Sequence, residues 1–127
     1  MGETEKKLKV LVVDDSSTNT FLLDSLLKEE GFDVFTTISG KKAIEIAAKQ
    51  LPHIILLDIM MPGMSGYDVL EIIKKDNTLK DIPVIIVTAK EQKDEYEKVK
   101  KMGAVDYIQK PIDLSQLVEK VKMHTRH

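Results

Sequence analysis

Three short stretches of the chain are apolar almost without a break, and they constrain the fold more than any other feature. They are KVLVV at residues 9–13, HIILL at 53–57 and PVIIV at 83–87. A strand with one face in water alternates apolar and polar residues, whereas a strand covered on both faces is continuously apolar. The three stretches therefore predict parallel strands that are buried between two layers of helices.

Segments with helical spacing separate and follow these strands. Apolar residues recur every three or four positions, as expected for amphipathic helices, in four groups: Leu22, Leu23, Leu26 and Leu27; Ala43, Ile44, Ala47, Ala48 and Leu51; Val69, Leu70 and Ile73; Leu114, Leu117, Val118 and Val121. A fifth segment, KEQKDEYEKVKKM, carries only a thin apolar stripe of Tyr96, Val99 and Met102. Because so little apolar surface is available for burial, we expect it to be the least stable helix.

Capping residues divide the chain at the same places. Ser39, Ser65 and Asp113 stand where helix N-caps are expected, and Gly31 and Gly103 stand where left-handed C-caps are expected. Weaker strands over residues 33–38 and 105–109 complete an alternation of five strands with five helices. This alternation predicts an α/β fold with a parallel sheet and helices on both faces, in a single domain over residues 1–127.

Composition narrows the possible functions. The net charge of −2 gives no basic field for nucleic acid or an anionic membrane, so we expect neither as a direct partner. The chain has no cysteine, which excludes disulfides and thiolate chemistry. His53, His124 and His127 are too scattered for a zinc site, and we expect the last two to decorate a helix end. The charged start MGETEKKLK lacks the apolar segment of a signal peptide, so a cytoplasmic location is expected.

Chemically complementary side chains follow the expected strands. Asp14 and Asp15 follow the first strand, Asp58 the third, Thr88 the fourth and Lys110 the fifth. Ligands of open parallel sheets bind beyond the carboxyl ends of the strands. Three acids, one hydroxyl and one ammonium are therefore expected at one edge of the sheet.

The charges of this group predict a metal. Two carboxylates about 5 Å apart repel by roughly 3 kcal/mol at an effective dielectric constant near 20. The single ammonium of Lys110 cannot neutralise three acids. A divalent cation is the simplest remedy, and Mg²⁺ fits best because it prefers oxygen ligands and also bridges phosphoryl oxygens.

Four motifs in order, LVVDDS, LLDIMMPGMSG, VIIVTA and GAVDYIQKP, carry a family resemblance. Together they resemble the receiver domain of bacterial two-component response regulators, including the chemotaxis receivers, over almost the whole chain. The resemblance implies a flavodoxin-like (βα)5 three-layer sandwich with a five-stranded parallel sheet in the order 2-1-3-4-5.

The resemblance also implies roles for the acids. Asp58 matches the phosphoacceptor of the family. Asp14 and Asp15 match the acidic pair that holds Mg²⁺, and Met60 matches the residue that offers its backbone carbonyl to the metal.

Other matching positions complete the implied site. Thr88 and Lys110 match the hydroxyl and ammonium that bind phosphoryl oxygens, and Tyr107 matches the aromatic residue that changes rotamer together with Thr88. The peptide bond between Lys110 and Pro111 is expected to be cis.

A signalling switch is the function that the resemblance implies. Asp58 would accept a phosphoryl group from a histidine kinase or phosphotransfer protein, with no enzymatic activity beyond the chain's own phosphorylation and dephosphorylation. Phosphorylation would then change binding of a downstream protein target or a separate output domain. The expected surface is formed by the fourth helix, the fifth strand and the fifth helix, and the expected state is a monomer or a phosphorylation-dependent dimer.

Three other functions are compatible with parts of the sequence. A Mg²⁺-dependent phosphohydrolase that forms an aspartyl phosphate usually needs a cap or long insertion, whereas the loops here are short. A flavodoxin-like cofactor binder needs a phosphate loop rich in Ser, Thr or Gly, but DDSSTN presents carboxylates that repel phosphate. A receiver-like module without phosphorylation chemistry is opposed by the intact set of site residues.

Four positions bear on partner choice and signal lifetime. Thr20 and Ile112 depart from residues common in the family, which leaves the identity of the partners open. In the family, residues at the positions of Met60 and Lys90 orient or obstruct the water that hydrolyses the aspartyl phosphate. A thioether is a poor acceptor and an ammonium accepts no hydrogen bond, so we expect slow hydrolysis.

Overall fold

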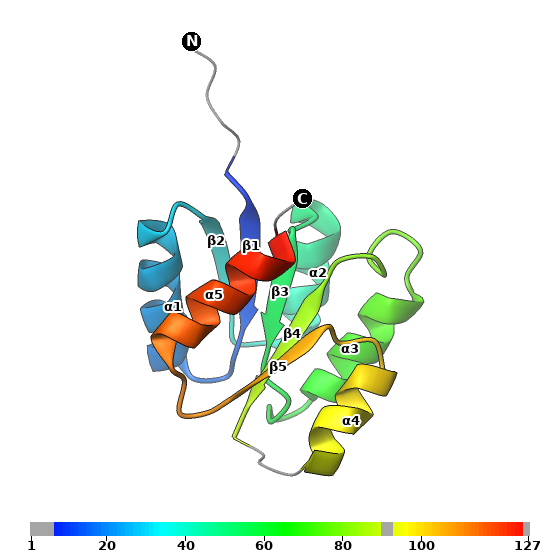
Figure 1. Cartoon of the computed structure of the whole chain (residues 1–127). Coiled ribbons are helices and arrows are strands. Elements are labelled where there is room, and N and C mark those ends of the chain that lie inside the picture. The colour runs from blue at the N-terminus through cyan, green and yellow to red at the C-terminus, as the bar shows by residue number, and fades with distance from the viewer. Residues whose placement is uncertain (1–6, 90–92, 126–127) are drawn as a thin grey trace.

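The computed structural model describes residues 7–89 and 93–125, and it contains a parallel sheet with helices on both faces (Figure 1). The strands are β1 (Lys9–Val13), β2 (Asp33–Thr37), β3 (Ile54–Leu57), β4 (Val84–Thr88) and β5 (Asp106–Gln109). The helices are α1 (Ser17–Glu29), α2 (Gly40–Gln50), α3 (Gly66–Lys75), α4 (Lys93–Lys101) and α5 (Leu114–Thr125). Within the described ranges, no helix has the length and apolar character needed to cross a membrane.

The strands lie in the order β2-β1-β3-β4-β5, and every neighbouring pair is parallel. This confirms the expected flavodoxin-like topology. The chain moves outward from β1 to β2 and then returns to β3 on the other side of β1, so the strand order reverses at this point. In register, Val13 pairs with Leu57, which places Asp14 and Asp58 directly after two paired residues.

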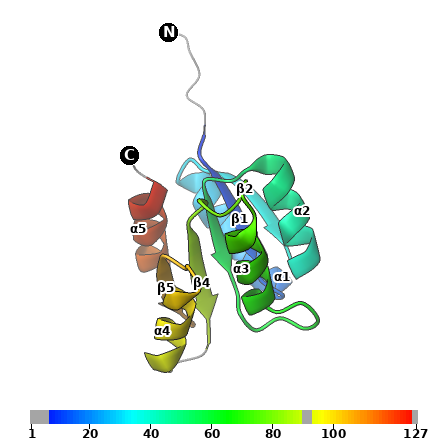
Figure 2. The same ribbon diagram turned by 90° about the vertical axis from the view of Figure 1, so that its right-hand side faces the viewer.

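Each apolar run contributes residues to two separate cores, one on each face of the sheet. Alternate residues of β1 and β3, such as Leu11 and Ile55, pack in a cluster with residues of α2, α3 and α4. The residues between them, such as Val10 and Ile54, pack in a second cluster with residues of α1 and α5. Figure 2 shows the first of these helical layers, with α3 lying between α2 and α4. The continuous apolar character of the strands is thus explained by burial on both faces.

Some details differ from the sequence prediction. Thr88 is the last residue of β4 and does not follow it, whereas His53 precedes β3. Leu51 was expected on the buried stripe of α2, but it lies just after that helix with a left-handed backbone, φ 49° and ψ 62°. Its side chain is 50% exposed, because the chain turns away from the helix axis before the stripe can continue.

The expected caps are all present. Ser39 accepts a hydrogen bond from the N–H of Lys42, and Asp113 accepts one from the N–H of Gln116. Gly31 and Gly103 have positive φ values of 96° and 109°. A cap that the sequence analysis did not assign is Ser16, whose hydroxyl accepts the N–H of Asn19 at the start of α1.

Ser65 forms the most complete cap. Its hydroxyl accepts the N–H of Asp68, and the Asp68 carboxylate accepts the N–H of Ser65, a capping box that begins α3. We expect Ser65→Ala to lower the free energy of unfolding by about 1 kcal/mol, because the backbone N–H of Asp68 loses its acceptor. Urea unfolding measures this change. Ser115→Ala, at an exposed position inside α5, is the matched control, and an equal loss in both variants would contradict the role of the cap.

Candidate functional site

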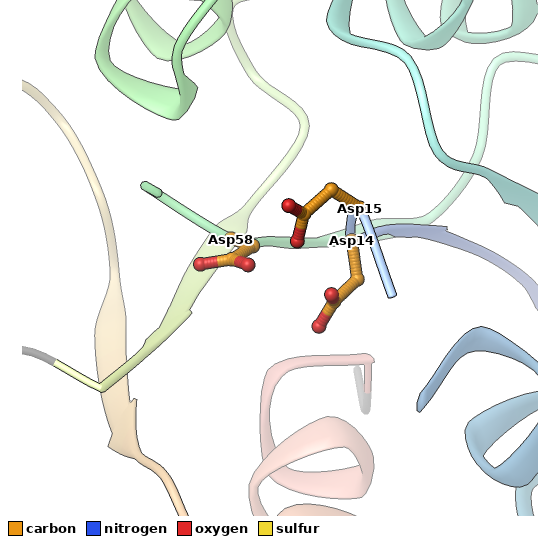
Figure 3. Close-up of side chains that lie close together, drawn as sticks. All are labelled: Asp14, Asp15 and Asp58. Atoms are coloured by element: carbon orange, nitrogen blue, oxygen red, sulfur yellow. The ribbon is translucent and has the colours of Figure 1, made fainter. Parts of the chain in front are cut away.

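Three carboxylates meet at the carboxyl edge of the sheet, as the sequence predicts (Figure 3). Asp14 and Asp15 follow β1, and Asp58 follows β3. Each offers an oxygen, and these oxygens all lie within 4.8 Å of one another. Asp14 and Asp58 are only 2% and 3% exposed, whereas Asp15 is open to solvent. The group is therefore buried on one side and accessible on the other.

Lys110, directly after β5, completes the cluster. Its Nζ lies 2.8 Å from Oδ2 of Asp14 and 3.3 Å from Oδ2 of Asp58. The bond between Lys110 and Pro111 is cis, which confirms the expectation from the family resemblance. The backbone N–H of Lys110 donates to the carbonyl of Thr88 at 2.9 Å, so this residue also joins the ends of β4 and β5.

Backbone donors hold the two buried carboxylates in place. The N–H of Ser16 donates to Oδ1 of Asp14 at 2.9 Å, and the N–H of Met60 donates to Oδ1 of Asp58 at 3.1 Å. In each case the other carboxylate oxygen faces Lys110. Asn19 adds a side-chain hydrogen bond to Oδ2 of Asp14 at 3.4 Å. The sequence analysis did not single out Asn19, although it belongs to the same DDSSTN segment.

The surroundings shift the pKa values of Asp58 and Lys110. Burial raises the pKa of Asp58, and the negative charge of Asp14 adds to this, against the opposing effects of the Met60 N–H and Lys110. Burial disfavours the Lys110 ammonium, but the hydrogen bond to Asp14 and the charges of both acids outweigh it, so the pKa of Lys110 is raised. Lys110 thus remains charged, while Asp58 lacks enough neighbouring positive charge to offset its burial.

The residues fit a hard divalent cation. One ammonium cannot balance three carboxylates, so two negative charges remain within a few ångströms of each other. The donors are all oxygens, and the exposed side at Asp15 can admit the water ligands that Mg²⁺ retains. This donor set suits magnesium better than a transition metal that prefers nitrogen or sulfur.

Thr88 ends β4 at this edge, whereas Tyr107 lies two residues before the end of β5. Thr88 is fully buried, and Tyr107 is half-buried with its ring in edge-to-face contact with Tyr96 of α4, 5.8 Å between centroids. Met60 is 53% exposed in the loop after β3. Lys90 lies outside the described residues.

Gly66 places α3 against the phosphoacceptor position that the family resemblance assigns to Asp58. Its N–H donates to the carbonyl of Ile59 at 2.9 Å, and a Cβ at this position would overlap the backbone carbonyl of Asp58. Only glycine permits this approach. The residue ends the LLDIMMPGMSG motif, but nothing in the sequence shows how near the two backbones come.

Two departures from the family and one surface prediction can be placed. Thr20 is buried in α1 and donates to the carbonyl of Ser17, and Ile112 packs against the core cluster beneath α1 and α5. His124 does not simply decorate a helix end. Its Nε2 lies 3.0 Å from Asp106, which also binds Lys120. Burial acts to raise the pKa of Asp106, but the hydrogen bonds from Lys120 and His124 outweigh it, so this pKa is lowered.

A pH-dependent stability follows from the raised pKa of Asp58. The folded protein binds a proton at Asp58 more tightly than the unfolded chain does. The ionised carboxylate therefore destabilises the fold at neutral pH. In metal-free buffer we expect Asp58→Asn to raise the free energy of unfolding at pH 7. The gain shrinks as the pH falls through the raised pKa of Asp58 and is absent below the ordinary carboxyl pKa, where Asp58 is protonated in both states. Urea unfolding across this pH range is the measurement, and a variant less stable than the wild type at pH 7 would contradict it.

Comparison with known proteins agrees with this geometry. The family model described as "Response regulator receiver domain" matches residues 10–122. The response regulator PleD of Caulobacter vibrioides is 42% identical over 118 residues, which cover 93% of this chain but only 26% of PleD. The polar-differentiation response regulator DivK of Brucella ovis is 36% identical over 115 residues, covering 91% of this chain and 94% of DivK.

A solved structure is also similar to this chain. The chemotaxis protein CheY4 of Vibrio cholerae has a TM-score of 0.88 and 25% identity, over 93% of this chain and 98% of that one. The family model covers well over half of the chain, and the strand order matches the flavodoxin-like fold of the structural neighbours. The chain therefore belongs to the response regulator receiver domain family of two-component signalling.

Proposed function

We propose that this protein is a phosphorylation-activated signalling switch in which Asp58 accepts the phosphoryl group. The observation that carries the proposal is the position of the Asp58 carboxylate, buried beside Asp14 and 3.3 Å from the Lys110 ammonium. A histidine kinase or phosphotransfer protein is the donor, and a downstream protein or output domain reads the result. A cytoplasmic location is part of the same proposal.

The transfer step makes and breaks bonds between Asp58 and the donor. A carboxylate oxygen of Asp58 attacks phosphorus, and an O–P bond forms as the P–N bond to the donor histidine breaks, with the electron pair leaving on that nitrogen. Lys110 lies close enough to donate to a phosphoryl oxygen as its charge develops. Asp14, Asp15, Asp58 and the backbone carbonyl of Met60 would hold Mg²⁺, which when bound supplies positive charge beside the phosphoryl oxygens.

The response to phosphorylation is proposed to run through Thr88 and Tyr107. The Thr88 hydroxyl turns toward the phosphoryl group, and Tyr107 then turns inward. The surface formed by α4, β5 and α5 thereby changes its affinity for a partner, because a partner responds only if it binds the two states differently. The partner can be a different protein or, after phosphorylation, a second copy of this chain.

The phosphoryl site is tested by mass. Acetyl phosphate with Mg²⁺ should add the mass of one phosphoryl group to the wild type, and Asp58→Asn should abolish the gain because its amide is not a competent nucleophile. Asp94→Asn, at an exposed position on α4, is the control and should behave like the wild type. Equal incorporation by the Asp58→Asn variant would show that another residue accepts the group.

Signal lifetime is tested by decay of the purified phosphoprotein in excess Mg²⁺. We expect slow loss in the wild type and faster loss in the double variant Met60→Asn, Lys90→Glu, since both new side chains can accept a hydrogen bond from the attacking water. An increase of severalfold or more is expected in hydrolysis, with little change in phosphorylation from a small donor. Met123→Asn, at an exposed position on α5, controls for surface polarity. Equal decay in the double variant and the wild type would show that these two side chains do not set the rate of hydrolysis.

A further inference from the structure

Helix α4 is held to the molecule by little apolar burial. Among its described side chains, Val99 is the apolar one with no exposed surface, whereas Tyr96 is 40% exposed. Most other positions are charged and exposed. A helix with so few buried contacts depends strongly on the contacts along its sides.

One of these side contacts reaches α3. The ammonium of Lys98 lies 4.1 Å from the centroid of the Tyr67 ring, well within the range of a cation–π interaction. Tyr67 is partly buried and packs against the core cluster beneath α2, α3 and α4. Figures 1 and 2 both show α3 and α4 side by side, so the contact joins two neighbouring helices.

Tyr67 is also tied to the backbone of Asp58. It directly follows Gly66, which is so close to the Asp58 carbonyl that a side chain cannot be inserted. The capping box of Ser65 and Asp68 fixes the backbone on both sides of Tyr67. The backbone that carries the Tyr67 ring is thus in direct contact with the backbone of Asp58 and Ile59.

The opposite side of α4 makes a second aromatic contact. Tyr96 meets Tyr107 of β5 edge to face. The helix thus lies between two rings, one attached to the loop that follows Asp58 and the other on the strand that leads to Lys110.

We propose that the Lys98–Tyr67 contact is a second coupling between Asp58 and α4, independent of the contact between Tyr96 and Tyr107. Lys98 and Tyr67 are positioning residues in this scheme. They hold α4 against α3 while Asp58 is unphosphorylated, and movement of the loop weakens the contact when Asp58 is phosphorylated. The signalling role rests on the proposed function, whereas the contact itself can be tested without phosphorylation.

Hydrogen exchange of the α4 backbone amides, read by NMR or mass spectrometry, tests the contact in the unphosphorylated protein. We expect Lys98→Gln and Tyr67→Leu each to speed exchange about two- to fivefold, the range expected for a surface cation–π pair. The double variant should exchange no faster than the stronger single variant, because both changes remove one interaction. Tyr67→Phe and Lys98→Arg keep the ring and the charge, so both should retain slow exchange.

Lys100→Gln is the matched control, since Lys100 lies on the same helix but over the Tyr96 ring, 5.7 Å from its centroid. Its effect should add to that of Lys98→Gln. Additive effects of Lys98→Gln and Tyr67→Leu, or exchange at the wild-type rate in Lys98→Gln, would overturn the proposed contact.

Acetyl phosphate and Mg²⁺ then test the coupling. Phosphorylation should speed α4 exchange in the wild type and change it less in Lys98→Gln, with equal phosphoryl uptake in both. An equal change in both proteins would overturn the coupling and leave the proposed function intact. A wild type that takes up no phosphoryl group would overturn the proposed function and the signalling role together, while the variant comparison would still decide the contact.

Discussion

Repulsion between buried carboxylates is the constraint around which this molecule is organised. Asp14 and Asp58 follow paired strands, so parallel register alone brings their charges together. Lys110 follows the edge strand β5, and its ammonium contacts the carboxylates of both Asp14 and Asp58. Its backbone also joins β4 to β5, so the residue that offsets the repulsion helps to close that edge of the sheet. Charge and topology are therefore linked at a single residue.

The apolar core beneath the site holds the strand ends together despite the repulsion between the carboxylates. Two apolar clusters, one on each face, use alternate residues of the same strands. The strand ends then have little freedom to move apart. Helix α4 is attached differently, since aromatic and electrostatic contacts of Tyr96 and Lys98 supplement the burial of Val99.

The fold and the central acids could be predicted because they follow from local rules. Continuous apolar runs specify doubly covered strands, and the residue after each run must reach the same edge. Leu51 was misplaced and the contact of His124 with Asp106 was missed, because a left-handed turn and a contact between separate elements depend on how the elements meet. Gly66 and the Lys98–Tyr67 pair were missed for the same reason, since neither backbone proximity nor a contact between helices leaves a periodic signal.

The weak attachment of α4 has a thermodynamic consequence. Inverting a two-state equilibrium from 1:99 to 99:1 requires about 5.5 kcal/mol of differential stabilisation. A surface cation–π contact contributes only about 0.5 to 1 kcal/mol. Under the proposed function, a contact of this size cannot supply that difference alone. A partner that binds one position of α4 would therefore contribute most of the free energy that selects it.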